Sequence, residues 1–360
     1  MNINTIVERV VRGATTKIIF SDRGKFLPLT LCMLLTMFGC SSTQGPTNME
    51  ALTPDRPLPA YTDVTYAHTS AQQRLDLYVP TRTVVLSPVV IWIHGGAFTV
   101  GDKRALAINN LRSPPQAAIV PAQQGPLIVS QIQIPDVAAL TAKGYAVVGL
   151  NYRLATRISS EKEFVLAVQH AVQDAKAAVR FLRANAALYH IDPDKFAAWG
   201  NSAGGYIASM LGATGDQATF FDDSSLGNID VSSAVQAVVD WFGPIDFASD
   251  SAQLAAVPAC AYLSARAAFP DNFIETAMQY SPLSYIKKAS VLPPFLIAHG
   301  DADCAVPSTQ SQELYIALHE AHAVATLTVL PNIGHEDPAF MRTQMTPALT
   351  FLDTVFGKIE

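Results

Sequence analysis

Charge is scarce in this chain, and the charge that is present has no basic excess. Only 15% of the 360 residues are Asp, Glu, Lys or Arg, and 24 Lys and Arg stand against 30 Asp and Glu, which gives a formal net charge of −6. Nucleic-acid-binding domains concentrate positive charge, and disordered chains combine high charge with few apolar residues. Because 49% of the residues are hydrophobic, neither class fits. No nucleic-acid partner is expected, and the chain is long enough to build a large core.

Apolar runs of about 20 residues, which a helix needs to cross a bilayer, are also missing. The run at residues 26–38 is shorter and follows a basic segment, which is typical of a secretory signal. It ends at Gly39 and Cys40, and this end resembles the cleavage box of bacterial lipoproteins, whose cysteine is lipidated and becomes the first mature residue. We expect residues 1–39 to be a signal peptide and Cys40 to anchor an exported protein to a membrane on its periplasmic or cell-surface side. Secretion without a lipid, an uncleaved anchor and a misplaced start codon are the alternatives.

Cysteine is rare, with four in the whole chain. Cys32 lies in the predicted signal and Cys40 at the predicted lipid, which leaves Cys260 and Cys304 as a pair in the body of the protein. An oxidising compartment would permit a disulfide between them, and two buried free thiols are the alternative.

Beyond a Ser- and Pro-rich tether at residues 40–60, strand and helix patterns alternate through residues 61–360. Strands are expected at residues 75–79, 84–94, 145–150, 196–199, 235–242, 294–298 and 323–330, and helices at 138–143, 161–188, 203–211, 309–322 and 346–356. Repeated strand-helix units predict one domain of the α/β class, with a mostly parallel sheet covered by helices on both faces. Ligands bind at the carboxyl ends of such strands, so motifs at those ends carry the most information.

The most specific of these motifs is a G-x-S-x-G at residues 200–204, between an expected strand and an expected helix. A tight strand-to-helix turn holds its serine in a strained conformation and exposes the hydroxyl at a helix N-terminus, where only small neighbours fit. An ordinary glycine-rich turn is the alternative. The context favours Ser202 as a nucleophile.

A glycine-rich loop at residues 94–98 directly follows the buried strand before the motif. Backbone N–H groups in such a loop can converge on the oxyanion of a tetrahedral intermediate, because no Cβ obstructs them. The expected donors are Gly96, Ala97 and the N–H of Ala203, whereas His94 is expected to orient the loop through a hydrogen bond. A generic turn is again the alternative.

A base and an acid are expected after the serine, in the order Ser, Asp, His. Two loops at strand ends supply them: residues 299–307 and residues 331–335. His335 is the histidine that follows the acid in a loop. Asp303 is preferred over Asp301 as the acid because it lies deeper in its loop.

Taken together, residues 75–356 resemble the α/β-hydrolase superfamily, and within it the carboxylesterases of the bacterial feruloyl-esterase-like and hormone-sensitive-lipase-like group. The motifs that carry the resemblance are HGGAF (94–98), GDK (101–103), NYRL (151–154), DAKAAVRFLRANA (174–186), GNSAGG (200–205), HGDADCAVP (299–307) and GH (334–335). The resemblance implies an α/β-hydrolase fold with a small cap or insertion over the site, and a triad of Ser202, Asp303 and His335.

Two segments of the chain are candidates to cover the substrate pocket. Residues 105–135 form a longer stretch than the resemblance leads one to expect, and residues 246–288 are the other candidate cap. An inconsequential surface insertion is the alternative for the first of them.

The expected function is that of a serine carboxylesterase acting on small to medium esters, with no cofactor. No metal is expected either, because His319 and His322 lack the H-E-x-x-H spacing of a zinc helix. An amidase, an arylformamidase or a peptidase-like hydrolase with the same triad is the alternative within this chemistry. A non-catalytic binding module fits less well, because all triad members are present. The oligomeric state is not readable from the sequence.

Overall fold

The computed structural model describes the chain in six ranges, which are residues 57–81, 85–104, 135–158, 160–215, 217–247 and 274–357. The chain divides into two units, Met1–Thr53 and Pro54–Glu360, and every described residue belongs to the second. The predicted signal peptide and Cys40 lie outside the described residues, as do Cys260 and nearly all of the insertion at 105–135.

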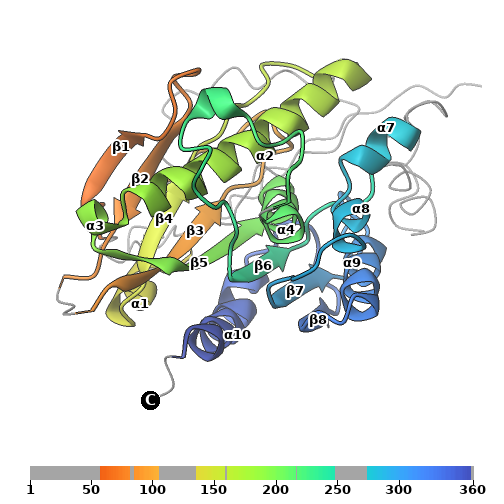
Figure 1. Ribbon diagram of the computed structural model, residues 1–360. Coiled ribbons are helices and arrows are strands. Elements are labelled where there is room, and N and C mark those ends of the chain that lie inside the picture. Colours follow the sequence, from red (N-terminus) through yellow and green to blue (C-terminus); the bar gives the residue numbers. More distant parts are fainter. Residues whose placement is uncertain are drawn as a thin grey trace, which may run out of the picture. The chain divides into compact units, whose positions relative to one another are not determined.

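An eight-stranded sheet, with the strand order β1-β2-β4-β3-β5-β6-β7-β8, organises the second unit (Figure 1). The strands are β1 (Tyr61–Thr65), β2 (Arg74–Tyr78), β3 (Ser87–Ile93), β4 (Ala146–Leu150), β5 (Ile191–Asn201), β6 (Ala237–Trp241), β7 (Phe295–Gly300) and β8 (Ala325–Leu330). Strand β2 pairs antiparallel with both of its neighbours, and the pairs from β4 across to β8 are parallel. This mostly parallel sheet confirms the predicted fold class.

Helices cover both faces of the sheet (Figure 1). They are α1 (Val137–Ala142), α2 (Glu161–Ala184), α3 (Ala186–Tyr189), α4 (Ala203–Thr214), α7 (Ile274–Gln279), α8 (Leu283–Ile286), α9 (Thr309–Glu320) and α10 (Ala339–Phe356), with a 3₁₀ turn at Ser224–Leu226. Alternate residues of β3 point to opposite faces, so that Val89 and Ile91 pack with α2, α4 and α9, whereas Val90 and Trp92 pack with α1 and α10. Within the described ranges, no helix is both long and apolar enough to span a bilayer.

Three tryptophans on neighbouring strands form the centre of the second face. Trp92, Trp199 and Trp241 are fully buried, and their rings meet edge to face with centroids 5.0 to 6.1 Å apart. Edge-to-face contacts of this kind add to the free energy gained from burying the rings. The cluster fixes β3, β5 and β6 relative to one another, and two of these strands lead directly into the loops of the site.

The structure differs from the sequence prediction at several element boundaries. Strand β1 was not predicted, because its residues are exposed or half-buried and so show no apolar alternation. The predicted helix at 161–188 is broken at Asn185, which ends α2 and begins α3. Strand β5 extends well before the predicted start at residue 196.

The last helix begins at Ala339 rather than at residue 346 and continues through Pro347. Proline removes one hydrogen bond from a helix interior, which disfavours a continuous helix. Here a buried stripe spaced four residues apart compensates by packing against the sheet. The stripe consists of Phe340, Gln344, Ala348, Leu352 and Phe356.

Cys304 is disulfide-bonded in the structure. The other three cysteines lie outside the described residues. The predicted partner, Cys260, therefore stays a prediction.

Candidate active site

Ser202 occupies a sharp turn between β5 and α4. Its backbone has φ +52° and ψ −123°, a region that side-chain-bearing residues rarely adopt. The turn is held by two backbone hydrogen bonds: the N–H of Ser202 donates to the oxygen of Trp241 at 2.9 Å, and the N–H of Tyr206 donates to the oxygen of Ser202 at 3.0 Å. The hydroxyl is thereby presented at the N-terminus of α4, as the G-x-S-x-G pattern predicts.

The glycines of the motif are required by close backbone approaches. A Cβ on Gly200 would lie 2.2 Å from the carbonyl atoms of Gly204. A Cβ on Gly204 would lie 1.9 Å from the backbone oxygen of Ile93 at the end of β3. The elbow is therefore packed directly against the strand that leads into the glycine-rich loop.

Ser202, His335 and Asp303 form a continuous row of hydrogen bonds. The Oγ of Ser202 lies 2.9 Å from Nε2 of His335, and Nδ1 of His335 lies 2.6 Å from Oδ2 of Asp303. A carboxylate only accepts hydrogen bonds, so Nδ1 carries the proton and Nε2 is free to accept the hydroxyl proton. The three residues follow β5, β8 and β7, and hence meet at the carboxyl edge of the sheet.

Asp303 is buried and accepts hydrogen bonds on both oxygens. Oδ1 accepts from the N–H groups of Ala305 and Val306, both at 2.8 Å. Burial alone would raise the pKa of Asp303, but attraction to His335 and hydrogen bonds from His299 and His335 outweigh it, and the pKa lies well below its usual range. The carboxylate therefore stays ionised beside the imidazole.

The alternative acid, Asp301, is exposed and has a different partner. Its Oδ1 accepts from the N–H of Asn332 at 2.6 Å, which joins the loops after β7 and β8. Asp303, and not Asp301, faces His335.

A second histidine, His299, also contacts the carboxylate of Asp303, and this contact was not predicted from the sequence. His299 is fully buried, with Nε2 2.9 Å from the oxygen of Val306 and 3.3 Å from Oδ2 of Asp303. Since a carbonyl only accepts, Nε2 carries the proton and Nδ1 accepts from the hydroxyl of Ser311 at 2.7 Å. Its position four residues before Asp303 was the only signal in the sequence.

The glycine-rich loop after β3 adopts left-handed backbone angles at three successive residues. Gly96, Ala97 and Phe98 have φ values of +112°, +50° and +61°. The N–H of Val100 donates back to the oxygen of Gly96 at 3.1 Å, which closes a tight turn. The third predicted donor, Ala203, is the first residue of α4, where N–H groups have no partner within the helix.

His94 forms a hydrogen bond with the backbone of this loop. Its Nδ1 lies 2.7 Å from the oxygen of Gly95, so Nδ1 is the protonated nitrogen. Burial lowers the pKa of His94, which keeps the ring neutral. The ring stacks on Tyr152 with centroids 4.5 Å apart, and the Tyr152 hydroxyl donates to the oxygen of His94 at 2.9 Å. Burial and the charge of Glu336 raise the pKa of Tyr152, so this donor keeps its proton.

Four aromatic rings form an apolar cluster one helical turn from Ser202. Phe98 contacts Phe164 of α2 and Tyr206 of α4, with centroids 6.1 and 5.7 Å apart. Phe247 contacts the same two rings at 4.9 and 5.1 Å. Phe98, Tyr206 and Phe247 are buried, so the cluster packs the glycine-rich loop against α2 and α4 as part of the hydrophobic core on that face of the sheet.

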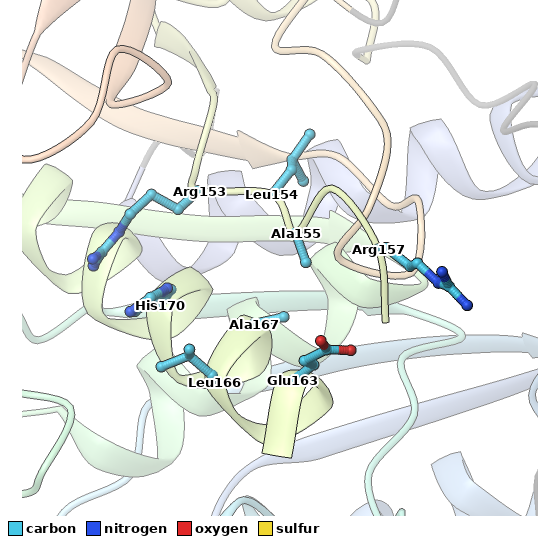
Figure 2. A pocket seen from close by; sticks show the side chains of 8 residues that line it. All are labelled: Arg153, Leu154, Ala155, Arg157, Glu163, Leu166, Ala167 and His170. Atoms are coloured by element: carbon cyan, nitrogen blue, oxygen red, sulfur yellow. The ribbon is translucent and has the colours of Figure 1, made fainter. Parts of the chain in front are cut away.

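A pocket of about 150 Å³ flanks this region (Figure 2). It lies between the loop after β4 and helix α2, and its lining residues are Arg153, Leu154, Ala155, Arg157, Glu163, Leu166, Ala167 and His170. The N–H of Ala155 donates to the oxygen of Phe98 at 2.9 Å, so the pocket adjoins the glycine-rich loop. None of the triad residues lines it, so it is not the cavity around Ser202.

The GDK segment is anchored to the antiparallel edge of the sheet. Lys103 forms ion pairs with Asp63 at 2.5 Å and with Asp76 at 3.4 Å, and Arg104 contacts the buried Asp76 at 2.7 Å. The backbone N–H of Lys103 also donates to the side chain of Asn151. The described residues that precede the insertion are therefore attached to the sheet by these ion pairs.

No group of three or more His, Cys, Asp or Glu that could hold a metal ion occurs among the residues that the structure describes.

Comparison with known proteins assigns the family. Residues 129–318, more than half of the chain, match the family model described as BD-FAE. The chain belongs to the BD-FAE family. The matched part of this BD-FAE member contains Ser202 and Asp303, whereas the glycine-rich loop at 94–98 and His335 lie outside it.

The curated relatives of this BD-FAE member are longer proteins. It is 27% identical over 311 residues to the esterase LipQ of Mycobacterium tuberculosis, and the alignment covers 82% of this chain and 62% of LipQ. The chain thus spans about half to three-fifths of the length of the curated relatives that it matches first.

Two similar solved structures are matched over nearly their full length. A truncated form of a carbohydrate esterase from gut microbiota is 26% identical with a TM-score of 0.61, covering 82% of this chain and 95% of that one. Thermogutta terrifontis esterase 2, solved after phosphorylation by paraoxon, shares the fold at 20% identity and a TM-score of 0.56, covering 84% and 96%. These likenesses confirm the predicted α/β-hydrolase fold and the resemblance to carboxylesterases.

Proposed function

We propose that this protein is a serine carboxylesterase that hydrolyses small to medium esters through an acyl-enzyme on Ser202. The observation that carries the proposal is the row of hydrogen bonds from Ser202 through His335 to Asp303, beside a loop with three left-handed residues. The ester class is supported by the relatives, since LipQ is named as an esterase and a similar solved structure as a carbohydrate esterase.

In the acylation step, the Oγ of Ser202 attacks the ester carbonyl while Nε2 of His335 takes the hydroxyl proton. The ionised Asp303 fixes the Nδ1–H tautomer and stabilises the imidazolium that forms. The backbone N–H groups of Gly96, Ala97 and Ala203 stabilise the oxyanion of the tetrahedral intermediate. The imidazolium then protonates the leaving alcohol, and the ester bond breaks.

In the deacylation step, a water molecule attacks the acyl-enzyme carbonyl. His335 again takes a proton, this time from the water, and the same N–H groups stabilise the second tetrahedral intermediate. The intermediate collapses with return of the proton to Ser202 and release of the carboxylic acid. Every step uses groups of this chain, water and the substrate.

Steady-state hydrolysis of p-nitrophenyl acetate and butyrate, measured beside the matching p-nitroanilides, tests the substrate class. We expect kcat/KM to be larger for the esters than for the anilides. The comparison is needed because amidases share the same triad, so that only the preferred substrate class separates an esterase from an amidase. Hydrolysis of anilides at equal or greater kcat/KM would favour the amidase alternative. Failure to hydrolyse either class would contradict the proposal.

Activity is expected to rise with pH through about pH 6–7 and then to level off, because neutral imidazole is the active base and histidine ordinarily titrates there. Asp303 contributes no second ionisation in this window, since its pKa is held below its usual range. Initial rates of ester hydrolysis between about pH 5 and about pH 8 test this expectation. A flat profile would contradict the role of His335 as the base.

A further inference from the structure

A buried amide joins three loops of the site. The side chain of Asn201, the residue before Ser202, accepts from the N–H of Gly95 on Oδ1 at 3.0 Å and donates from Nδ2 to Oε1 of Glu336 at 2.9 Å. Asn201 is fully buried, and Glu336 is 3% exposed. The three partners belong to the elbow, the glycine-rich loop and the loop that carries His335.

The orientation of this amide follows from the chemistry of its partners. A backbone N–H only donates and a carboxylate only accepts, so Asn201 must place its oxygen toward Gly95 and its nitrogen toward Glu336. The negative charge on Glu336 polarises the amide and strengthens the bond that its oxygen accepts from Gly95. A charged acceptor is thus connected, through one amide, to the backbone of the glycine-rich loop.

Gly95 is restrained on both sides. Asn201 holds its N–H, and Nδ1 of His94 donates to its oxygen at 2.7 Å. Because the peptide group is planar and trans, fixing the oxygen of Gly95 also fixes the direction of the N–H of Gly96, which is a proposed oxyanion donor. A Cβ on Gly95 would lie 2.9 Å from the backbone oxygen of Asn201 and 3.0 Å from Oε1 of Glu336, so the approach needs glycine.

Glu336 is placed there by an unusual backbone. It directly follows His335, and its φ of +61° is uncommon for a residue with a side chain. Such a conformation persists only where the surroundings over-determine it. Here the buried bond to Asn201 is one such restraint, and it turns the carboxylate away from solvent while His335 faces Ser202.

We propose that Glu336 is a positioning residue, which sets the glycine-rich loop relative to His335 by bonding through Asn201. This inference rests on the proposed function. It does not make Glu336 a catalytic residue, since the groups it acts on are Asn201 and, through it, Gly95 and Gly96. Misplaced oxyanion donors weaken binding of the transition state more than binding of the ground state, so the effect belongs in kcat.

A double-mutant cycle of Glu336→Ala, Asn201→Ala and the two together tests the proposal, with p-nitrophenyl butyrate as substrate. Each single change is expected to lower kcat about 10- to 100-fold with KM within about two-fold, which corresponds to loss of one charge-assisted hydrogen bond. The double variant is expected to be no worse than the poorer single variant, because both remove the same bridge. Losses that multiply in the double variant, or losses confined to KM, would overturn the proposal.

Affinity for a transition-state analogue separates positioning from general damage to the fold. The inhibition constant of an alkylboronic acid, which forms a tetrahedral adduct on a serine, is expected to rise in step with the fall in kcat/KM across the series. Glu336→Gln is expected to recover at least part of the activity lost in Glu336→Ala, since its amide oxygen can accept from Asn201. No recovery in a folded Gln variant together with an unchanged inhibition constant would overturn the proposal.

A matched control is available in the neighbouring residue. Asp337 lies just before α10 and accepts from the N–H of Ala339 at 2.7 Å, and the side-chain oxygen of asparagine can accept the same bond, so Asp337→Asn is expected to leave kcat and stability unchanged. The esterase function and the positioning role of Glu336 fail in different ways. A wild-type protein without activity would contradict the esterase function. An active wild-type protein with an equally active Glu336→Ala variant would contradict only the positioning role.

Discussion

Alanine in place of Ser202 is expected to lower kcat for ester hydrolysis by about 10⁶-fold, the size of effect that follows loss of the nucleophile in serine hydrolases with a comparable triad. His335 and Asp303 cannot compensate, because their task is to move the proton of the missing hydroxyl. The fold should persist. Both hydrogen bonds that hold the turn use the backbone of residue 202, so alanine retains them.

Rates with p-nitrophenyl acetate, corrected for spontaneous hydrolysis, measure this loss, and denaturant unfolding shows whether stability is kept. Ser225→Ala is the control, because Ser225 is an exposed serine in the 3₁₀ turn whose hydroxyl contacts only its neighbour Asp223 among the bonds observed. Retention of more than about one-hundredth of wild-type activity in Ser202→Ala would contradict the nucleophile.

Replacement of Asp303 by asparagine should lower kcat about 10⁴-fold, as it does in other enzymes whose histidine is oriented by a buried aspartate. Geometry explains why the smallest possible change is so severe. Oδ1 of Asp303 accepts from two backbone N–H groups, of Ala305 and Val306. The asparagine must keep its oxygen there, which turns its NH₂ group toward Nδ1 of His335. Nδ1 must then accept, the proton moves to Nε2, and Nε2 no longer accepts from Ser202.

Asp301→Asn is the matched control for this change, because it makes the same chemical substitution two residues away in the same loop. Its partner is the backbone of Asn332 rather than His335. We therefore expect kcat within a few fold of wild type. Equal losses of kcat for the two asparagine variants, measured with the same ester, would contradict the role of Asp303 in orienting His335. They would show that a change anywhere in this loop lowers the activity.

Much of the fold was predictable because it depends on local patterns. Buried parallel strands such as β3 appear as dense apolar runs, and the order of strands and helices fixes which loops share an edge of the sheet. The triad candidates could be placed for the same reason, since all three follow strands that run parallel. Strand β1 escaped prediction because an exposed edge strand has no apolar alternation.

The supporting contacts of the site were not predictable in the same way. His299 lies in the same motif as Asp303, yet its bond to Val306 depends on how the loop closes. Asn201 and Glu336 are separated by 135 residues in sequence and meet only in the folded chain. Residues of this kind carry no local signal beyond being neighbours of Ser202 and His335, because their partners are set by tertiary packing rather than by periodicity.

The role of Ser202 as the nucleophile is tested most directly by the mass of the protein after treatment with paraoxon. This reagent phosphorylates activated serines and has phosphorylated the structurally similar Thermogutta terrifontis esterase 2. We expect one diethylphosphoryl group per chain, located on the peptide that contains Ser202, with loss of ester hydrolysis in proportion to labelling and no labelling of Ser202→Ala. Labelling of another residue, or full ester hydrolysis by protein labelled at Ser202, would contradict this role.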